Sequence, residues 1–455
     1  MMKTELRFWG AAGCVTGSKY LISNQQGRIL VDCGLFQGLK SLRALNRASW
    51  EIPPADIAAV VLTHGHLDHV GLLPRLVREG FRGKIYGTRP TLAIARIILE
   101  DSAKIQMEEA EKALKEGYSR HAKPEPLYSL EDVANTLPLF SSVETGEWIA
   151  LPVPGWRVRY TPNGHILGSC FIEMDAGGTR VVFSGDIGRR EDLLLPPPGR
   201  PRRADVLLLE STYGNRLHPD LDMEAELAAQ IKETITDRGT CIIPSFAVER
   251  LQAIMLILLK LRQRNRIPRL PVYIDSPMGT NVFELFGRFP NWHKLSRSDF
   301  QEMKREFLIV SDYSETWKAI DDPRPKVVVA GSGMLSGGRV LTYLAQLLDR
   351  EETRILLMGY QAEGTRGRNL LEGARELKIF GKYIRVAAGI HHYESLSAHA
   401  DQEEILWWTA GMENQPGHIF LVHGEPTAAD ALRVKLFAER GWVARIPNLG
   451  ESVRF

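Results

Sequence analysis

Residues 57–69 read IAAVVLTHGHLDH, a short apolar run that passes directly into three histidines and an aspartate. A nearly continuous apolar run of this length is typical of a strand buried on both faces. Imidazole nitrogens and carboxylate oxygens are suitable ligands for Zn²⁺, and four such side chains so close together are hard to explain otherwise. The alternative is a polar loop that happens to hold three histidines. We therefore expect a metal site at the end of a buried strand.

The spacing within this motif indicates two ions. His64 and His66 are two residues apart, so their side chains share one face of an extended loop. Asp68 and His69 follow after the chain has turned and are placed to face a second ion. The arrangement differs from the helical H-E-x-x-H pattern, in which residues i and i+4 share a helix face.

These residues cannot complete two metal sites, so we looked for further ligands where other strands end, because a sheet holds such positions rigidly. Three candidates lie there: His165 in TPNGHILGS, Asp186 in VVFSGDIG and His423 in IFLVHGE. Asp186 has two carboxylate oxygens with which to bridge both ions. Taken singly, each of the three is more often a turn residue or a satisfied polar group; together with the first motif they are the expected ligands.

Length and composition indicate the number of domains and the broad class of the protein. A chain of 455 residues has room for two or three domains, and 44% hydrophobic with 25% charged residues is ordinary for a globular protein. The net charge of +2 does not by itself indicate a nucleic-acid partner, although the Arg-rich stretches 187–203 and 261–269 are either local basic surfaces or solvated segments. Four scattered cysteines exclude a Cys-type zinc finger. Without a bilayer-length apolar run or a signal peptide, we expect no membrane and a cytoplasmic location.

The predicted secondary-structure pattern changes along the chain. Up to about residue 210, short β-rich runs alternate with turns; beyond it, strands alternate with helical runs, which indicates a parallel α/β sheet. From residue 389 the chain returns to His-containing loops. We therefore expect one domain, residues 1–210 and 389–455, interrupted by an inserted domain, residues 211–388.

The motif H-x-H-x-D-H after a buried strand resembles the metallo-β-lactamase superfamily, and Asp32, His165 and Asp186 follow the order of that superfamily's other motifs. The resemblance implies an α/β fold, an αββα sandwich, with two Zn²⁺ per chain. It implies that His64, His66 and His165 hold one zinc, that Asp68, His69 and His423 hold the other, and that Asp186 bridges. Asp32 would support the metal loop by hydrogen bonding, outside the ligand set.

The inserted α/β domain makes the whole chain similar to the β-CASP nucleases, most of all to bacterial members related to the polyadenylation nuclease. The extra motifs of that family are matched by Glu210 in LLLEST, His399 in SLSAHAD and His423 in LVHGE. A histidine in the third of them is typical of members that process RNA. The resemblance therefore implies a zinc-dependent ribonuclease that cuts single-stranded RNA internally, with or without 5′-to-3′ exonuclease activity, leaves 5′-phosphate and 3′-hydroxyl ends, and forms a homodimer.

Within this mechanism we expect His399 to be the general acid and Glu210 to hold its imidazole and stabilise its charged form. Asp68 and Asp186 belong to the catalytic metal centre. The glycine-rich stretch GSGMLSGGR (331–339) follows a strand and offers Ser332 and Ser336 to RNA phosphates, although a tight β-α turn explains it equally well. Further candidate RNA contacts are Arg366, Arg368 and Ser397. The alternative for the two arginines is that they are simply solvated surface residues.

Three competing functions share some of these motifs. A small-molecule metallohydrolase would have the zinc ligands but would need neither the insert nor the Glu210–His399 pair. A catalytically silent RNA-binding scaffold is disfavoured because every expected ligand is present. A DNA nuclease is the nearest rival, and His423 is the feature against it.

Overall fold

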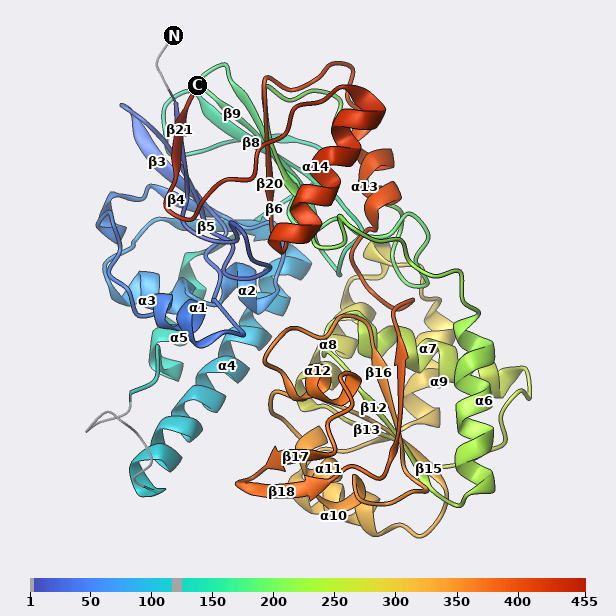
Figure 1. Cartoon of the computed structure of the whole chain (residues 1–455). Coiled ribbons are helices and arrows are strands. Elements are labelled where there is room, and N and C mark those ends of the chain that lie inside the picture. Colours follow the sequence, from blue (N-terminus) through green and yellow to red (C-terminus); the bar gives the residue numbers. More distant parts are fainter. Residues whose placement is uncertain (1–3, 117–124) are drawn as a thin grey trace. The chain divides into compact units, whose positions relative to one another are not determined.

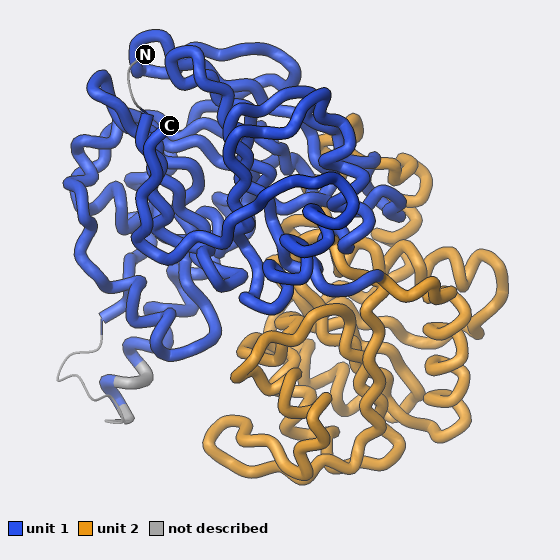
Figure 2. The backbone as a smooth tube through the Cα atoms, turned by 45° about the horizontal axis from the view of Figure 1, so that its top comes forward, with its two compact units in different colours: residues 1–217, 399–455 blue, residues 218–398 orange. Residues whose placement is uncertain are grey.

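The computed structural model describes residues 4–116 and 125–455, and contacts divide the chain into two compact units (Figures 1 and 2). The first unit comprises Met1–Leu217 and His399–Phe455, and the second comprises His218–Ala398. The chain therefore leaves the first unit once and returns to it, in the manner of an insertion.

Both boundaries of the insertion lie later than residues 210 and 388, where the sequence placed them. Residues Gly389–Tyr393 form strand β19, which pairs with β16 (Arg354–Met358) of the second unit. The expectation of loops immediately after residue 388 is therefore wrong. At the other boundary, Tyr213 forms a β-bridge with Asp401, which keeps the chain after Glu210 with the first unit.

The first unit contains two mixed sheets. Seven strands form one sheet in the order β21-β1-β2-β3-β4-β5-β6: β21 (Ser452–Arg454), β1 (Glu5–Phe8), β2 (Tyr20–Asn24), β3 (Gly27–Val31), β4 (Ala59–Val61), β5 (Lys84–Thr88) and β6 (Phe140–Val143). Six strands form the other in the order β20-β11-β10-β9-β8-β7: β20 (His418–Val422), β11 (Val206–Glu210), β10 (Arg180–Phe183), β9 (Cys170–Ala176), β8 (Trp156–Pro162) and β7 (Trp148–Ala150).

The helices of the first unit lie outside the two sheets (Figure 1). On the side of the seven-stranded sheet they are α1 (Lys40–Leu45), α2 (Leu67–Val70), α3 (Leu73–Arg78), α4 (Arg89–Glu116) and α5 (Leu130–Thr136), with the short 3₁₀ turns η1 (Pro54–Asp56) and η2 (Leu137–Leu139). On the other side they are α13 (Gln402–Thr409) and α14 (Pro426–Arg440).

Alternation along the strands accounts for these layers, because successive side chains of a strand point to opposite faces. In β11, Leu207 and Leu209 join the core beneath α13 and α14. On the opposite face of that sheet, Phe183 and Phe420 meet aromatic rings of the other sheet, as in the Phe8–Phe420 contact at 5.0 Å. The order helix, sheet, sheet, helix is the metallo-β-lactamase sandwich expected from the sequence.

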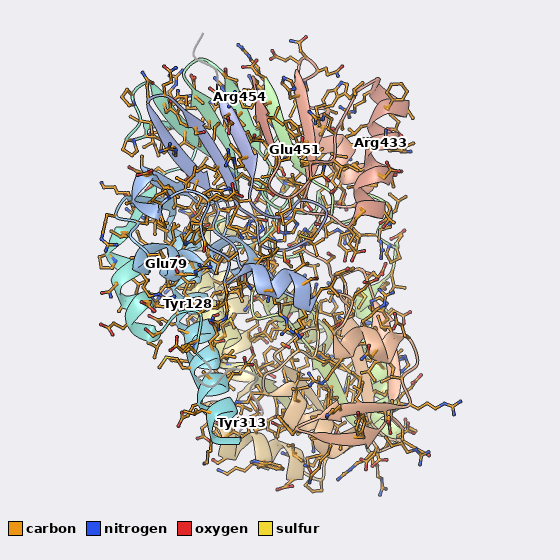
Figure 3. The ribbon with its side chains drawn as sticks, turned by 60° about the vertical axis from the view of Figure 1, so that its left-hand side comes forward. Glu79, Tyr128, Tyr313, Arg433, Glu451 and Arg454 are labelled. Atoms are coloured by element: carbon orange, nitrogen blue, oxygen red, sulfur yellow. The ribbon has the colours of Figure 1, made fainter. Side chains whose placement is uncertain are left out.

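The C-terminal strand β21 completes the seven-stranded sheet by pairing antiparallel with β1. Arg454, which Figure 3 shows near Glu451 at this edge, forms an ion pair with Glu5 at 2.8 Å. In the part of the chain that the structure describes, no helix has both the length and the apolar character needed to span a bilayer.

The second unit is built on a six-stranded sheet in which every recorded strand pairing is parallel. Its order is β14-β13-β15-β12-β16-β19, with β12 (Thr240–Pro244), β13 (Val272–Asp275), β14 (Leu308–Ile309) and β15 (Lys326–Ala330) beside β16 and β19. The remaining elements are α6 (Met223–Thr236), α7 (Arg250–Gln263), α8 (Pro277–Arg288), η3 (Pro290–Trp292), α9 (Arg297–Glu306), α10 (Tyr313–Asp321), α11 (Val340–Leu347), α12 (Arg366–Leu371), β17 (Glu376–Ile379) and β18 (Lys382–Arg385). This is the predicted parallel α/β insert.

Candidate metal centre

The motif at residues 64–69 spans the junction between a buried strand and a short helix. After β4 the chain stays extended as far as His66, whose φ of −66° and ψ of 152° precede α2. The chain then turns, so that Asp68 and His69 lie on the first helical turn while His64 and His66 precede it. The local backbone therefore separates the motif into the two pairs expected from its spacing.

The first group of converging side chains consists of His64, His66, His165 and Asp186. His66 Nδ1 lies 3.1 Å from His64 Nε2 and 3.2 Å from His165 Nε2. Asp186 Oδ2 lies 3.4 Å from His64 Nε2 and 3.5 Å from His165 Nε2. Four ligands about 2.0–2.1 Å from a tetrahedral Zn²⁺ are separated by about 3.3 Å, so these distances fit that ion.

The second group consists of Asp68, His69 and His423. Asp68 Oδ2 lies 3.2 Å from His423 Nε2 and 3.9 Å from His69 Nε2. His423 adopts φ = +49° directly after β20, and Thr212 Oγ1 lies 3.1 Å from its Nδ1. A side chain from near the C-terminus is thereby fixed beside the first motif.

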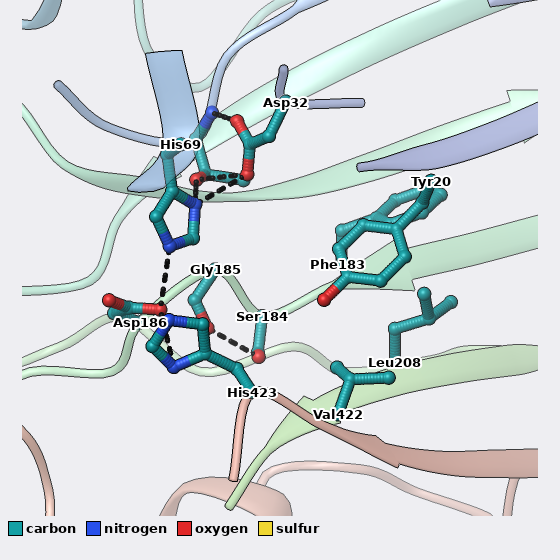
Figure 4. A pocket seen from close by; sticks show the side chains of 11 residues that line it. Tyr20, Asp32, His69, Phe183, Ser184, Gly185, Asp186, Leu208, Val422 and His423 are labelled. Carbon is teal, nitrogen blue, oxygen red and sulfur yellow. Dashed lines mark hydrogen bonds and ion pairs between the residues drawn. The ribbon is translucent and has the colours of Figure 1, made fainter. Parts of the chain in front are cut away.

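Asp186 belongs to both groups. While its Oδ2 faces His64 and His165, its Oδ1 lies 3.3 Å from His69 Nε2 and 3.5 Å from His423 Nδ1 (Figure 4). Oδ1 is buried and accepts no hydrogen bond. A buried carboxylate oxygen without a hydrogen-bond partner is costly unless a cation offsets it, which fits a bridging position between two metal ions.

The titration of these groups also suits a metal. Burial lowers the pKa of His66 to about 4 and, together with the charge of His69, lowers that of His64 well below its ordinary value. Both rings are therefore neutral at pH 7, as ligands must be. Burial opposes ionisation of Asp186 and Asp68, but the neighbouring histidines lower both pKa values below normal, well below in the case of Asp186.

Asp32 holds the motif from behind, in the position that the sequence suggested. Its Oδ2 lies 2.8 Å from His69 Nδ1, which directs Nε2 of that ring toward the second group. Its Oδ1 accepts from the Thr63 backbone N–H and its Oδ2 from the Thr63 hydroxyl, both at 2.8 Å. The sequence analysis missed the contribution of Thr63. The only signal for it in the sequence was its place at the strand end, next to His64.

Lys19 joins two segments that pack against this motif, and its contribution was also missed. Its Nζ donates to the backbone carbonyls of Gly17 at 2.9 Å and Gly34 at 2.8 Å. The adjacent Ser18 donates its backbone N–H to the Asp68 carbonyl, and its hydroxyl lies 3.3 Å from His69 Nε2. Burial lowers the pKa of Lys19 to about 8.

Glu210 and His399 are brought together beside the metal groups. Glu210 is fully buried at the end of β11, and its Oε2 lies 3.2 Å from His399 Nδ1. The His399 ring is 4.5 Å from that of His165 between centroids, which places it at the edge of the first group. Burial disfavours the charged imidazole, but Glu210 outweighs it and raises the pKa of His399.

The five expected RNA contacts all lie in the second unit, and most of them are engaged within it. Ser332 Oγ accepts from the Ser336 backbone N–H at 3.1 Å and so closes the glycine-rich loop. Arg366 donates to the carbonyls of Leu335 and Lys378, and Arg368 pairs with Glu372 at 2.7 Å. Ser397 is buried. Only Ser332, Ser336 and Arg366 therefore belong to one structural feature.

Comparison with known proteins agrees with this architecture. Residues 12–223 match the model of the metallo-beta-lactamase superfamily, residues 251–370 that of the Beta-Casp domain, and residues 383–447 that of the Zn-dependent metallo-hydrolase RNA specificity domain. A solved structure of a protein of unknown function from Enterococcus faecalis covers 100% of both chains with a TM-score of 0.56 at 14% identity, which is a likeness of fold alone.

Two curated relatives align along nearly the whole chain. Ribonuclease TTHA0252 of Thermus thermophilus is 37% identical over 98% of both proteins. Transcription termination factor FttA of Methanosarcina mazei is 30% identical over 99% of this chain and 71% of its own length. Together with the three family matches and the converging ligands, these alignments show that the chain belongs to the metal-dependent β-CASP nucleases of the metallo-β-lactamase superfamily.

Proposed function

We propose that this chain is a ribonuclease that uses two Zn²⁺ ions to hydrolyse phosphodiester bonds of single-stranded RNA. The observation that carries the proposal is the pair of ligand groups that share Asp186, with Glu210 and His399 beside them. The end-to-end similarity to a ribonuclease supports RNA as the substrate. His64, His66, His165 and Asp186 would hold one ion, and Asp68, His69, His423 and Asp186 the other.

Zinc bound there would lower the pKa of a coordinated water and offset negative charge on the phosphate. The chain itself supplies the proton for the leaving 3′ oxygen. Because Nδ1 of His399 lies against Glu210, Nε2 is the nitrogen that delivers this proton. Glu210 keeps the ring oriented and charged, while Asp32 holds the His69 ring in its place. Such chemistry needs no 2′-hydroxyl and leaves 5′-phosphate and 3′-hydroxyl ends.

The RNA contacts follow from the same proposal. Arg366 acts through the loop that carries Ser332 and Ser336, because its guanidinium is bonded to that loop's carbonyl at Leu335. Arg368 would exchange its surface partner Glu372 for a phosphate, and Ser397 precedes His399 by two residues. The family resemblance adds internal cutting, with or without 5′-to-3′ exonuclease activity, and a homodimer, for which light scattering of the zinc-loaded protein is the test.

The decisive experiment is cleavage of a 5′-labelled single-stranded RNA by zinc-loaded protein, beside its DNA copy. Asp68→Ala should abolish cutting and His399→Ala should lower it about 10²–10⁴-fold, whereas His418→Ala, on β20 and outside both ligand groups, should leave it unchanged. RNA cut well above DNA supports the proposal. Equal cutting of DNA would favour a DNA nuclease, and zinc binding without cleavage of either polymer would refute the ribonuclease function.

A further inference from the structure

The second unit carries a β-hairpin outside its main sheet, formed by β17 and β18 (Figure 1). The register pairs Lys378 with Tyr383 and Leu377 with Ile384. Leu377 and Ile379 are buried against the unit. Because side chains alternate along a strand, the opposite face points to solvent, and it carries Glu376, Lys378, Tyr383 and Arg385.

Two aromatic rings are exposed on this hairpin. Tyr383 is 64% exposed and Phe380, at the tip, is 56% exposed. Full burial of a large apolar side chain stabilises a fold by about 1.5–3 kcal/mol, and neither ring is fully buried here. Their packing within the described structure therefore does not explain why these positions are aromatic.

The backbone at the tip makes Phe380 still harder to explain by folding. Phe380 and Gly381 form a two-residue turn with φ of +48° and +81°. Positive φ at both central positions defines a type I′ turn, which favours Asn, Asp or Gly, whereas a bulky side chain is unusual at such a φ. The chain thus tolerates an exposed ring in an unfavourable backbone conformation, a combination often found where a residue serves binding.

Positive charge accompanies the two rings. Lys378, Lys382 and Arg385 are exposed, and among the described residues none of these three lies within ion-pair distance of a carboxylate. Lys378 Nζ sits 5.7 Å from the centroid of the Tyr383 ring. Glu376, opposite Arg385 in the register, offsets part of this charge. Flat aromatic rings beside exposed cations, only one of which faces a carboxylate across the hairpin, match a ligand that has both bases and phosphates.

The hairpin is also joined to the loop from which RNA contacts are expected. Arg366 Nε donates to the Lys378 carbonyl at 2.8 Å, and its Nη1 donates to the Leu335 carbonyl at 3.1 Å. One guanidinium therefore connects β17 with the loop of Ser332 and Ser336. Phosphates bound at that loop would have the hairpin as their neighbour within the same unit.

We propose that the hairpin is a binding platform for a single-stranded segment of RNA. Bases stack on Tyr383 and Phe380, and phosphates are held by Lys378 and Arg385, which share the face of Tyr383. The inference rests on the proposed ribonuclease function, because it assigns the hairpin to the same substrate. A stacking surface is tolerant of sequence, so the platform adds affinity for unpaired RNA and gives little base specificity.

Binding is measured by anisotropy of a labelled RNA of about 20 nucleotides, using zinc-loaded protein with Asp68→Ala so that the RNA survives. Tyr383→Ala weakens binding by at least about fivefold, the lower end of one base–aromatic stack. Lys378→Ala reduces the slope of log Kd against log salt by about 0.7, one single-strand phosphate contact. The matched controls are Phe437→Ala, a 61% exposed ring on α14, and Lys232→Ala, an exposed charge on α6; both leave the affinity unchanged.

Phe380→Asn separates binding from folding. Asparagine suits a positive φ, so the Tm of this variant equals or exceeds that of the parent while RNA affinity falls. If Tyr383→Ala and Phe380→Asn both bind RNA as the controls do, the platform is refuted, and a change of molar mass in light scattering would then assign the hairpin to self-association. If the unmodified protein cuts RNA and the Asp68→Ala protein binds it, failure of the platform leaves the ribonuclease function intact. If neither cleavage nor binding is seen, both the ribonuclease function and the platform are refuted.

Discussion

Replacing Asp32 with asparagine tests whether the metal loop depends on a carboxylate or only on the shape of the side chain. Asp32 accepts three contacts of 2.8 Å, from the Thr63 backbone, the Thr63 hydroxyl and His69 Nδ1. Asparagine preserves the volume but has a single acceptor oxygen. With that oxygen on the Thr63 backbone N–H, its NH₂ group faces two donors, and His69 loses the partner that fixes its ring.

The size of the effect follows from these contacts. Loss of a carboxylate that orients a ligating histidine typically weakens metal binding about 10–100-fold, or about 1.4–2.7 kcal/mol. His69 belongs to the second ligand group, whereas the first is completed without it by His64, His66, His165 and Asp186. We therefore expect one zinc to be lost at a chelator concentration at which the other is retained.

The assay is competition of zinc-loaded protein with a chromophoric chelator, read as metal released per chain. Asp56→Asn, an exposed aspartate on η1, is the matched control and should release zinc as the unmodified protein does. Thermal unfolding of the metal-free proteins, recorded in parallel, separates weakened binding from a weakened fold. Release identical to that of the control, or loss of both ions together without a change in Tm, would refute the role assigned to Asp32.

Other predictions follow from the same contacts. Zinc removal lowers Tm as well as abolishing cleavage, because buried Asp186 and half-buried Asp68 lose their counter-charge; an unchanged Tm in calorimetry would contradict this. His399→Ala lowers kcat about 10²–10⁴-fold with zinc content intact, as expected for a general acid. Glu210→Gln moves the alkaline limb of the pH–rate profile to lower pH, since Glu210 raises the pKa of His399. For Lys19 the folded pKa of about 8 lies below the ordinary 10.5, so the unfolded chain binds more protons between these values and stability rises with pH there. Urea unfolding at both ends of this window should show a gain of up to about 3 kcal/mol that Lys19→Met lacks.

The sequence predicted the parts of the fold that have strong patterns. The run ending at Thr63 became β4, and the change from β-rich to alternating texture marked the insert. Strand β19 was missed because it lies at the end of its sheet and carries His391 and His392, so it lacks the apolar signature of a buried strand. The hairpin β17–β18 was not predicted either, because its turn is Phe-Gly and lacks the Asn-Gly or Asp-Gly pair that usually identifies a hairpin.

The candidate ligands were predictable for a related reason: His165, Asp186 and His423 are ambiguous singly, but each follows a β run and together they accompany the motif at residues 64–69. The contacts of Arg366 were not, because nothing in the sequence distinguishes a guanidinium bonded to backbone carbonyls from one exposed to solvent. Lys19 was equally hidden, because one of its carbonyl acceptors, Gly34, belongs to a separate segment that approaches it only in the folded chain. Long cationic side chains are therefore the residues for which sequence reasoning performed worst.

The point at which the second unit is inserted explains why the Glu210–His399 pair accompanies it. Glu210 ends β11 shortly before the chain leaves the first unit, and His399 is the residue on which it returns. Between them the two crossing segments are tied together inside the first unit: Gln402 donates its backbone N–H to the Arg216 carbonyl and its side-chain amide to the Gly214 carbonyl. These bonds hold His399 within reach of Glu210 at the edge of the metal groups. The Glu210–His399 pair is therefore a consequence of the insertion site as well as of the residues that occupy it.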